Sequence, residues 1–247
     1  HNGVVTEYKA DNIILATGAR ARNLPTIKID GQRVWGAREA MTPTALPRRL
    51  LVIGAGAIGV EFASLYNDLG CDVTLVEALP RIVPVEDADI SALAEKAFKQ
   101  RGIKVHTSTL VKALDTSGAD TIAHLETASG AQTVAVDQVI LAAGITGNIE
   151  NLGLEQLSVA TEANFIKTDA FGKTNLAGLY AIGDVAGAPW LAHKASHEAV
   201  ICVEKIAGVE DVKPLNKQRV PGCTYCRPQI ASVGLTEAQA IAAGHSV

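Results

Sequence analysis

The 247-residue chain has few aromatic residues, a single methionine and only four cysteines, and neither sign of charge dominates. Its 22 Lys and Arg residues against 26 Asp and Glu residues give a net charge of −4. Scattered basic residues with only 4% aromatics argue against a nucleic-acid-binding surface. No apolar run approaches the ~18 residues that a membrane-spanning helix needs, so no membrane segment is expected.

The cysteines lack the spacing of a disulfide framework. Cys71, Cys202, Cys223 and Cys226 are therefore predicted to be free thiols, as in a reducing cytoplasm. Cys223 and Cys226 form a CxxC pair, for which a thioredoxin-type redox centre is the alternative to an unreactive pair. Without a second CxxC, a zinc site is not expected.

Other polar pairs also favour structural roles. His193 and His197 are spaced i, i+4, but without the Glu of an HExxH motif, so no metal site is expected. Asp87 and Asp89 are interpreted as residues at the start of a helix and not as paired catalytic carboxylates. The chain starts at His1 without a methionine, and we expect it to be an internal piece of a longer protein.

With 48% apolar and 19% charged residues, the chain has the composition of a globular protein. Apolar runs and alternation predict strands, and a 3.6-residue period predicts helices. The expected strands are Val4–Tyr8, Asn12–Ala16, Leu50–Ile53, Asp72–Glu77, Ile103–His106, Val111–Leu114, Ile122–Thr127, Thr133–Val136, Val139–Ala143 and Leu179–Ile182. The expected helices are Ala57–Leu69, Asp89–Arg101 and Ala192–Ala207, each followed by a glycine that suits a C-cap.

Two helices have readable apolar faces. In the first, Ile58, Phe62, Leu65 and Leu69 share one side, and in the second, Ile90, Leu93 and Ala97 do; both sides are expected to be buried. Prolines at 25, 43 and 47 predict a linker before the first of these helices. The tail from Val220 is expected to begin a new strand-rich unit.

The middle of the chain interrupts the alternation of strands and helices. Three short strands, separated by the turns TSGAD and ASGAQ, occupy the place of a crossover helix before Val139. A β-meander in this position distinguishes the chain from ordinary doubly wound dehydrogenases. The predicted fold class is therefore α/β, with a Rossmann-like domain that contains a β-meander crossover.

A glycine-rich stretch lies between a predicted strand and a predicted helix. Gly54, Gly56 and Gly59 have the spacing Gly-x-Gly-x-x-Gly, which suits a tight turn, close approach to a pyrophosphate, and packing of the helix on the sheet. Glu77 ends the next strand, where its carboxylate would accept hydrogen bonds from ribose hydroxyls and repel the 2′-phosphate of NADP. The pattern predicts a dinucleotide site that favours NAD.

Two further stretches indicate a second nucleotide. The segment Ile13–Ala19 ends a strand in Thr-Gly, and the segment Leu176–Gly187 ends one in Gly183-Asp184. An Asp directly after a buried strand is placed to bind a ribityl or ribose hydroxyl. Because the two stretches lie on either side of the NAD pattern, they are more informative together than either alone.

These motifs resemble those of the pyridine nucleotide–disulfide oxidoreductases, most closely the branch that oxidises dihydrolipoamide as the E3 component of 2-oxoacid dehydrogenase complexes. The resemblance rests on ATGA, GAGAIGVEFA, VTLVEALPRIVPVEDADIS, NLGLEQL, YAIGDVAGAPWLAHKASHEA and PGCTYCRPQIASVGLTEAQA. It implies an NAD-binding domain at 41–147, flanked by parts of an FAD-binding domain at 1–40 and 148–217, and the start of an α+β interface domain at 218–247.

The same resemblance implies FAD and NAD as cofactors, and two sets of binding residues. The NAD set is Gly54, Ala55, Gly56, Ala57, Ile58, Gly59, Val60, Glu61, Glu77, Leu110 and Gly144. The FAD set is Thr17, Gly18, Ala19, Asp184, Trp190, Leu191, Ala192 and His193. Many relatives carry an arginine after Gly144, where this chain has Ile-Thr-Gly-Asn.

The resemblance also implies a reaction and partners. Electrons would pass from dihydrolipoamide on an E2 lipoyl domain to a cysteine disulfide, then to FAD and NAD⁺, in a homodimer. No residue of this chain matches the family's redox cysteine pair or its His–Glu base, so no catalytic residue is assigned. Another NAD(P)H-dependent FAD disulfide reductase and a catalytically silent nucleotide-binding module are the alternatives.

Overall fold

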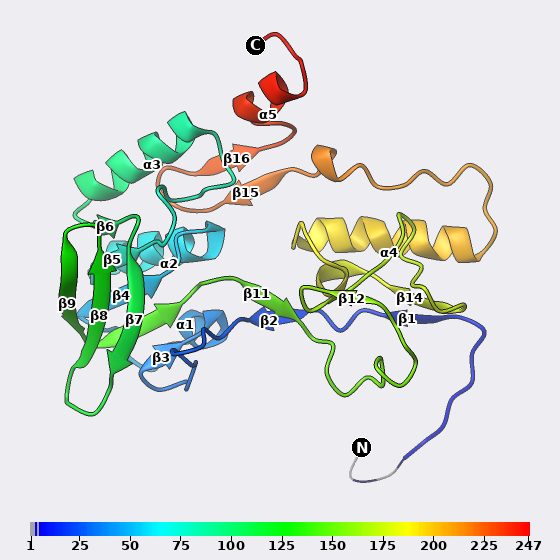
Figure 1. Ribbon diagram of the computed structural model, residues 1–247, viewed down its shortest axis with the longest axis horizontal. Helices are drawn as coiled ribbons and strands as arrows, with labels where there is room; N and C mark the ends of the chain where they lie inside the picture. Colours follow the sequence, from blue (N-terminus) through cyan, green and yellow to red (C-terminus); the bar gives the residue numbers. More distant parts are fainter. Residues whose placement is uncertain (1–2, 4) are drawn as a thin grey trace. The chain divides into compact units, whose positions relative to one another are not determined.

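The computed structural model describes residue 3 and residues 5–247 of the chain. It divides into two compact units, and each unit combines separate stretches of the sequence. Unit 1 contains the chain up to Arg20 together with residues 145–220, and unit 2 contains residues 21–144 and 221–247. Figure 1 shows the strands and helices of both units.

Unit 2 is built on a parallel sheet in the order β3-β10-β4-β5-β6. Its strands are β3 (Val34–Trp35), β10 (Gln138–Leu141), β4 (Arg49–Ile53), β5 (Asp72–Val76) and β6 (Lys104–His106). The chain runs from β4 outward to β6, and then returns to the other side of β4 at β10. This reversal of direction makes the β4–β10 boundary a topological switch point, the usual place for a ligand in such sheets.

Side chains of β4 alternate between two cores. Leu50 and Val52 are buried in a cluster with the helices, whereas Leu51 and Ile53 are buried in a second cluster with the antiparallel strands. A strand that is covered on both faces reads as a continuous apolar run, which is why this segment is recognisable in the sequence.

Helices α2 (Ala57–Asp68) and α3 (Ala88–Gln100) agree with the predicted ranges, and glycines with positive φ follow both. The predicted buried face of α2 is right for Phe62, which is 8% exposed, and wrong for its other three residues. Val60, Ala63 and Tyr66 are at most 1% exposed, whereas Leu65 and Leu69, like Ile58, lie on the exposed side. The packed face therefore combines small residues with aromatic rings, in place of the longer leucines.

The predicted buried face of α3 is wrong. Ser91, Ala94 and Phe98 are buried, whereas Leu93 is 60% exposed. The Ser91 hydroxyl donates to the Ile82 carbonyl at 2.8 Å, which gives this polar residue a partner inside the core. Ala94 and the large Phe98 side chain join the same core as the buried face of α2.

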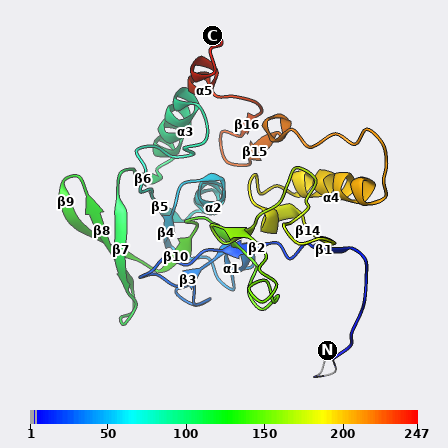
Figure 2. The same cartoon turned by 45° about the vertical axis from the view of Figure 1, so that its right-hand side comes forward.

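The predicted meander is confirmed as a three-stranded antiparallel sheet in the order β7-β8-β9. Its strands are β7 (Leu110–Asp115), β8 (Thr121–Thr127) and β9 (Gly130–Val136). Ala123, Leu125 and Val136 pack against the parallel sheet on the face opposite the helices. Figure 2 shows these strands as a separate layer beside the sheet.

The prediction of a linker between Pro25 and Pro47 is wrong. This stretch contains β3 and the short helix α1 (Ala37–Met41), and β3 pairs with β10 at the end of the sheet. The Tyr66 hydroxyl donates to the Ala40 carbonyl at 2.7 Å, so α2 anchors α1. The prolines mark turns around elements that are too short for periodicity to reveal.

Unit 1 is centred on a parallel pair of strands covered by one helix. Its elements are β1 (Ile13–Leu15), β2 (Ala19–Ala21, which ends in unit 2), β11 (Ile145–Gly147), β12 (Thr161–Glu162), β13 (Phe165–Ile166), β14 (Leu179–Ala181), the 3-10 helix η1 (Gly183–Ala186), α4 (Ala192–Ile206) and the 3-10 helix η2 (Lys217–Arg219). β1 pairs with β14, and β2 pairs with β11. The predicted strand at Val4–Tyr8 is wrong for residues 5–8, and Val4 lies outside the described residues.

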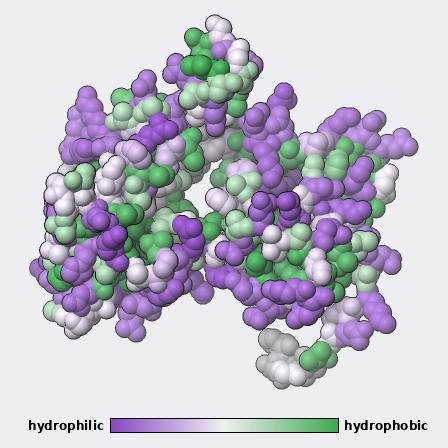
Figure 3. All heavy atoms as spheres, viewed as in Figure 1, coloured by the Kyte–Doolittle hydropathy of each residue, from purple (hydrophilic) through white to green (hydrophobic). Residues whose placement is uncertain are grey.

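Residues 221–247 pack within unit 2. They form β15 (Gly222–Thr224), β16 (Ile230–Ser232) and α5 (Glu237–Ala242). Cys226 and Ile230 join the core beside α2, so the strand-rich tail extends the helical layer. On the face shown in Figure 3, polar residues are spread over both units. Apolar residues form small groups among these polar residues.

The start of β4 is held by one carboxylate. Asp137, just before β10, accepts hydrogen bonds from the backbone amides of Arg48 and Arg49 at 3.0 and 2.9 Å. The Arg49 guanidinium also donates to it, at 2.5 and 3.1 Å. These hydrogen bonds hold the pKa of the Asp137 carboxyl below its usual value.

We predict that Asp137→Asn lowers the Tm at pH 7 by about 2–4 °C, as expected for the loss of about 1 kcal/mol in a chain of this size. A lowered pKa in the folded state stabilises the fold above the unfolded pKa and loses this effect as pH falls through the folded value. The Tm difference between the two proteins should therefore begin to shrink below about pH 4, and should shrink further as pH falls through the lowered pKa of the folded state. A Tm difference that persists unchanged at pH 3 would contradict this role.

Candidate functional sites

The glycine-rich loop of unit 2 packs too tightly for side chains at two positions. A Cβ at Gly54, where φ is +97°, would lie 2.5 Å from the Ala142 carbonyl oxygen. A Cβ at Gly59 would lie 1.8 Å from the Gly54 carbonyl oxygen. These contacts bring α2 close to the ends of β4 and β10, which confirms that the spacing serves a close turn between strand and helix.

The middle glycine has a different environment. A Cβ at Gly56 would have no atom within 4 Å, so Gly56 faces open space at the N-cap of α2. No side chain caps this helix end. Backbone N–H groups with a positive helix dipole and no side-chain partner form a site suited to a phosphate group. The loop residues thus fit a dinucleotide pyrophosphate.

The residues next to the loop glycines differ in which of their atoms a ligand could contact. Ala55 and Val60 are fully buried in the core, so only their backbone is available to a ligand. Ala57 and Ile58 are exposed in the first turn of α2. Glu61, one turn further, accepts a hydrogen bond from the Tyr225 amide at 2.7 Å. The helix that begins at the glycine loop is therefore tied to the segment before β16.

Glu77 contacts the glycine loop directly. Its side chain lies after the end of β5 and is nine-tenths buried. One carboxylate oxygen accepts from the Ala55 amide at 2.6 Å, and the other accepts from the Leu79 amide at 2.9 Å. A carboxylate has about four acceptor positions, so these two bonds leave room for ribose hydroxyls.

The switch point carries a residue that the sequence did not indicate. Gly144 follows β10, and the Arg22 guanidinium lies 3.6–3.7 Å from a Cβ built on it. Arg22 donates to the Ala143 carbonyl at 2.7 and 3.2 Å. A cation therefore stands beside Gly144, although the next residue is Ile145 and not arginine. Leu110 begins β7 and is about half exposed.

In unit 1, two predicted FAD segments lie at the same edge. β1 and β14 are parallel, and the Ile182 amide donates to the Leu15 carbonyl at 3.1 Å. The segments that follow the two strands therefore start side by side. β1 leads to Thr17-Gly18, and β14 leads to η1 with Asp184. These segments were predicted to act together, and the strand pairing brings them together.

The turn at Thr17 and Gly18 is held by the segment after β11. The Thr17 hydroxyl donates to the Asn148 carbonyl, and the Asn148 side chain donates to the Thr17 carbonyl, both at 2.8 Å. Arg20 binds the Asn148 side chain at 2.8 Å and forms an ion pair with Glu150. This ion pair holds the pKa of the Glu150 carboxyl at about 2.

Helix α4 begins with Leu191 as its N-cap, and no side chain caps it. Ala192 and His193 occupy its first turn, as predicted for the segment that would approach a flavin. The Trp190 ring lies 5.5 Å from the ring of Phe165, measured between centroids. An uncapped helix end favours negative charge, which suits the anionic ring of a reduced flavin.

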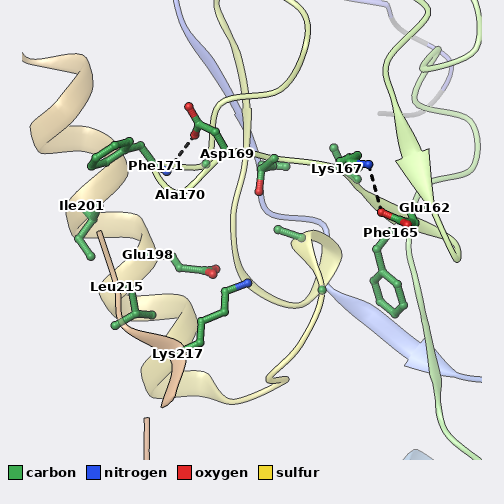
Figure 4. A pocket seen from close by; sticks show the side chains of 16 residues that line it. Glu162, Phe165, Lys167, Asp169, Ala170, Phe171, Glu198, Ile201, Leu215 and Lys217 are labelled. Atoms are coloured by element: carbon green, nitrogen blue, oxygen red, sulfur yellow. Dashed lines mark hydrogen bonds and ion pairs between the residues drawn. The ribbon is translucent and has the colours of Figure 1, made fainter. Parts of the chain in front are cut away.

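A cavity of about 470 Å³ lies within unit 1, between the Phe165–Gly172 segment and α4. Figure 4 shows Glu198 pointing from α4 into this cavity. Glu198 also forms a 3.0 Å ion pair with Lys194, a residue that is fully buried. Neither residue was predicted to belong to a site, although their i, i+4 spacing on one helix was visible in the sequence.

The CxxC pair differs from a reactive thiol pair. Cys226 is 1% exposed, and its Sγ donates to the Pro228 carbonyl at 3.1 Å. Burial raises the pKa of the Cys226 thiol, which opposes the thiolate form that redox chemistry requires. Among the described residues, no group of three or more His, Cys, Asp or Glu side chains is able to hold a metal ion.

No helix in the described part of the chain combines the length and apolarity required to cross a membrane.

The Pyridine nucleotide-disulphide oxidoreductase family model matches residues 1–199, and the dimerisation-domain model of that family matches residues 220–247. The chain belongs to the pyridine nucleotide-disulphide oxidoreductase family. This membership confirms the predicted family and the Rossmann-like α/β fold class.

Similar proteins are dihydrolipoyl dehydrogenases. That of Rhizobium etli is 55% identical over 97% of this chain, and that of Zymomonas mobilis is 50% identical over 97%. The structure of LpdA from Mycobacterium tuberculosis matches 98% of the chain with a TM-score of 0.88 and 31% identity. The flavoprotein disulfide reductase RclA from Escherichia coli matches 94% with a TM-score of 0.85 and 26% identity.

The chain spans about half the length of these relatives, at 50% and 52% of the two dehydrogenases and 52% and 53% of the two structures. The cofactors of this family are FAD and NAD, as predicted from the motifs. All the residues predicted for NAD lie in unit 2, and all those predicted for FAD lie in unit 1.

We predict that alanine at two glycines of the loop has separable effects. Gly59→Ala should destabilise the fold by about 1–3 kcal/mol, because its Cβ cannot be accommodated beside the Gly54 carbonyl. Gly56→Ala should leave the Tm unchanged and weaken NADH binding on the order of tenfold, equivalent to about 1.4 kcal/mol, because its Cβ occupies the space open to the pyrophosphate.

Thermal melts and NADH fluorescence titrations distinguish the two outcomes. Gly130→Ala is a suitable control for added bulk, because Gly130 also has open space around it but lies in the meander. Its φ of +115° predicts a loss of stability without a specific loss of NADH affinity. Unchanged NADH affinity in Gly56→Ala would show that the dinucleotide does not bind at this loop.

Proposed function

We propose that the protein carrying this chain is a dihydrolipoyl dehydrogenase, which oxidises dihydrolipoamide with NAD⁺ through a cysteine disulfide and FAD. The observation that carries the proposal is the glycine loop braced by Glu77, in a chain 55% identical to a dihydrolipoyl dehydrogenase. When bound, FAD and NAD supply the electron and hydride transfer. The residues of this chain supply binding and orientation.

Unit 2 would hold NAD. The uncapped end of α2 and the open space at Gly56 suit the pyrophosphate, and Glu77 suits the ribose hydroxyls. Leu110 and Gly144, at the ends of neighbouring elements, would line the rest of the site. Glu61, on the same helix, would lie toward the nicotinamide.

Unit 1 would hold part of FAD. Asp184 would accept a hydrogen bond from the ribityl chain, and Thr17, Gly18 and Ala19 would border the cofactor. The backbone of Trp190–His193 at the start of α4 would face the flavin ring, where the helix dipole stabilises the negative charge of the reduced state. These roles place the chain's contribution in cofactor positioning.

The wider assignments belong to the same proposal. Residues 1–40 and 148–217 would be parts of an FAD-binding domain, 41–147 the NAD-binding domain, and 218–247 the start of the interface domain. The dimerisation-domain match supports a homodimer. An E2 lipoyl domain would deliver the substrate in the cytoplasm, without nucleic acid or membrane as a partner.

Another FAD disulfide reductase of the family is the second candidate, because the RclA structure superposes with a TM-score of 0.85. A steady-state assay of the protein that carries this chain decides between them. It compares oxidation of dihydrolipoamide by NAD⁺ with reduction of glutathione disulfide by NADH or NADPH. Turnover of dihydrolipoamide supports the proposal. Cofactor binding without turnover of either substrate would support the catalytically silent alternative.

We predict that NADH binds at least tenfold more tightly than NADPH, because the 2′-phosphate would meet the Glu77 carboxylate. Glu77→Gln should narrow this preference, mainly by improving NADPH binding. It should also weaken NADH, because Glu77 holds the Ala55 and Leu79 amides. Calorimetric titrations of both nucleotides measure the effect, with the exposed Glu126→Gln as a control. Equal affinities in the wild type would contradict this assignment.

We also predict that the Cys223→Ser, Cys226→Ser double variant keeps the dihydrolipoamide–NAD⁺ activity of the protein that carries this chain. The reason is that Cys226 is buried and bonded to a carbonyl group. Loss of stability is expected from Cys226→Ser alone, since a hydroxyl replaces a core thiol. The assay is therefore run well below the Tm of the variant. Loss of activity in a folded double variant would identify the pair as a redox centre.

A further inference from the structure

Helix α4 buries a lysine in its first turn. Lys194 is 0% exposed, and its ammonium group has three acceptors within hydrogen-bond distance. These are the Gly187 carbonyl at 2.8 Å, the Gly183 carbonyl at 3.0 Å and the Glu198 carboxylate at 3.0 Å. An ammonium group has three donors, so Lys194 is fully satisfied by these contacts.

Glu198 completes the arrangement from the next turn of the helix. The oxygen that pairs with Lys194 also accepts a hydrogen bond from the Gly183 amide at 2.8 Å. Gly183 is thus held through both its amide and its carbonyl group. Gly187, which ends the turn, is held through its carbonyl group.

The two glycines begin and end the turn that carries Asp184. Both have positive φ, +72° at Gly183 and +94° at Gly187, so the path of the turn is defined by residues with high intrinsic freedom. Two charged side chains on one rigid helix remove that freedom. A polar partner at each end restricts the backbone more than an apolar contact, because hydrogen bonds are directional.

A buried ion pair is a costly way to stabilise a fold. Desolvation of both charges offsets much of their attraction, and apolar residues of similar size are often as stabilising. Here the pair lies where the turn after β14 meets α4. Besides the bond to each other, Lys194 and Glu198 form hydrogen bonds to Gly183 and Gly187 of that turn. The contacts are thus directed to the geometry of the turn.

We propose that Lys194 and Glu198 are positioning residues that hold the Gly183–Gly187 turn in the conformation in which Asp184 binds FAD. This inference rests on the proposed FAD role of unit 1. Neither side chain needs to contact the cofactor, because both act through the backbone on either side of Asp184. Apparent affinity falls in proportion to the fraction of molecules with a competent turn.

The experiment compares Lys194→Met, Glu198→Gln and the double variant in the protein that carries this chain. Lys194→Met leaves the Glu198 carboxylate, whose side chain is 16% exposed, without its cation and should lower the Tm. Adding Glu198→Gln removes that uncompensated charge while its amide oxygen still accepts from Gly183, so the Tm should recover. The exposed Lys205→Met and Glu204→Gln, on the same helix, are the matched controls.

Three measurements are made on each variant: the Tm, the dissociation constant for FAD added to the flavin-free protein, and hydrogen exchange of the 179–190 segment. We expect FAD binding to weaken about tenfold in the double variant, as for a turn that is competent in about a tenth of molecules. Exchange at Gly187 should accelerate, although the Tm has recovered and the Gly183 amide keeps its acceptor.

The outcomes separate positioning from simple stabilisation. FAD affinity that recovers together with the Tm in the double variant would overturn the proposal, as would exchange in the turn equal to that of the controls. If the wild type binds no FAD, the proposed function fails, whatever the variants do. If the wild type binds FAD and all variants bind equally well, the positioning role alone is wrong.

Discussion

The structure of unit 2 depends on one close approach, between the carbonyl group of Gly54 and the helix at Gly59. At that point a side chain would lie 1.8 Å from the oxygen, so helix and strand meet backbone to backbone. Because the backbone of β4 and the start of α2 are fixed in this way, the amides of the first helical turn point to open space at Gly56. The same contact brings α2 down on the sheet and buries Val60 and Ala63.

Glu77 extends this constraint to the neighbouring strand. A carboxylate that is nine-tenths buried requires hydrogen-bond donors, and the Ala55 and Leu79 amides provide them. The residue therefore serves the fold before any ligand arrives, since it joins the loop after β4 to the end of β5. Its remaining acceptor positions face the part of the site where a ribose would lie. Fold and cofactor preference thus depend on the same side chain.

The sequence predicted the elements of the site better than the surfaces of the helices. The sequence shows the site through two local features: the fixed spacing of Gly54, Gly56 and Gly59, and the position of Glu77 at the end of the next strand. The predicted buried faces of α2, except at Phe62, and of α3 were wrong. The sequence pattern groups the long apolar residues, whereas the buried faces combine small residues such as Ala63 and Ala94 with the rings of Tyr66 and Phe98. β3 and α1 were missed because two and five residues are too few to show a period.

Residues that act across the sequence leave no local pattern. Arg22 reaches the Ala143 carbonyl, 121 positions away, and Arg20 reaches Asn148 at a similar separation. Both bonds depend on strands that are adjacent only after folding. The absence of an arginine after Gly144 therefore does not leave that point of unit 2 without a cation, since Arg22 stands beside it. A motif comparison by position detects the missing residue, whereas only the fold reveals the arginine that lies nearby.

The two units use different means to hold the chain where it leaves a strand. In unit 2 the loop after β4 is rigid because its glycines fit against neighbouring backbone, and a side chain there is excluded by contact. In unit 1 the turn after β14 has glycines with space around at least one of them, Gly187, so sterics do not define its path. Charged side chains from α4 take over that task through directional bonds to the backbone. Where packing does not restrict the backbone of a glycine, hydrogen bonds to that backbone must fix the conformation that a bound cofactor would need.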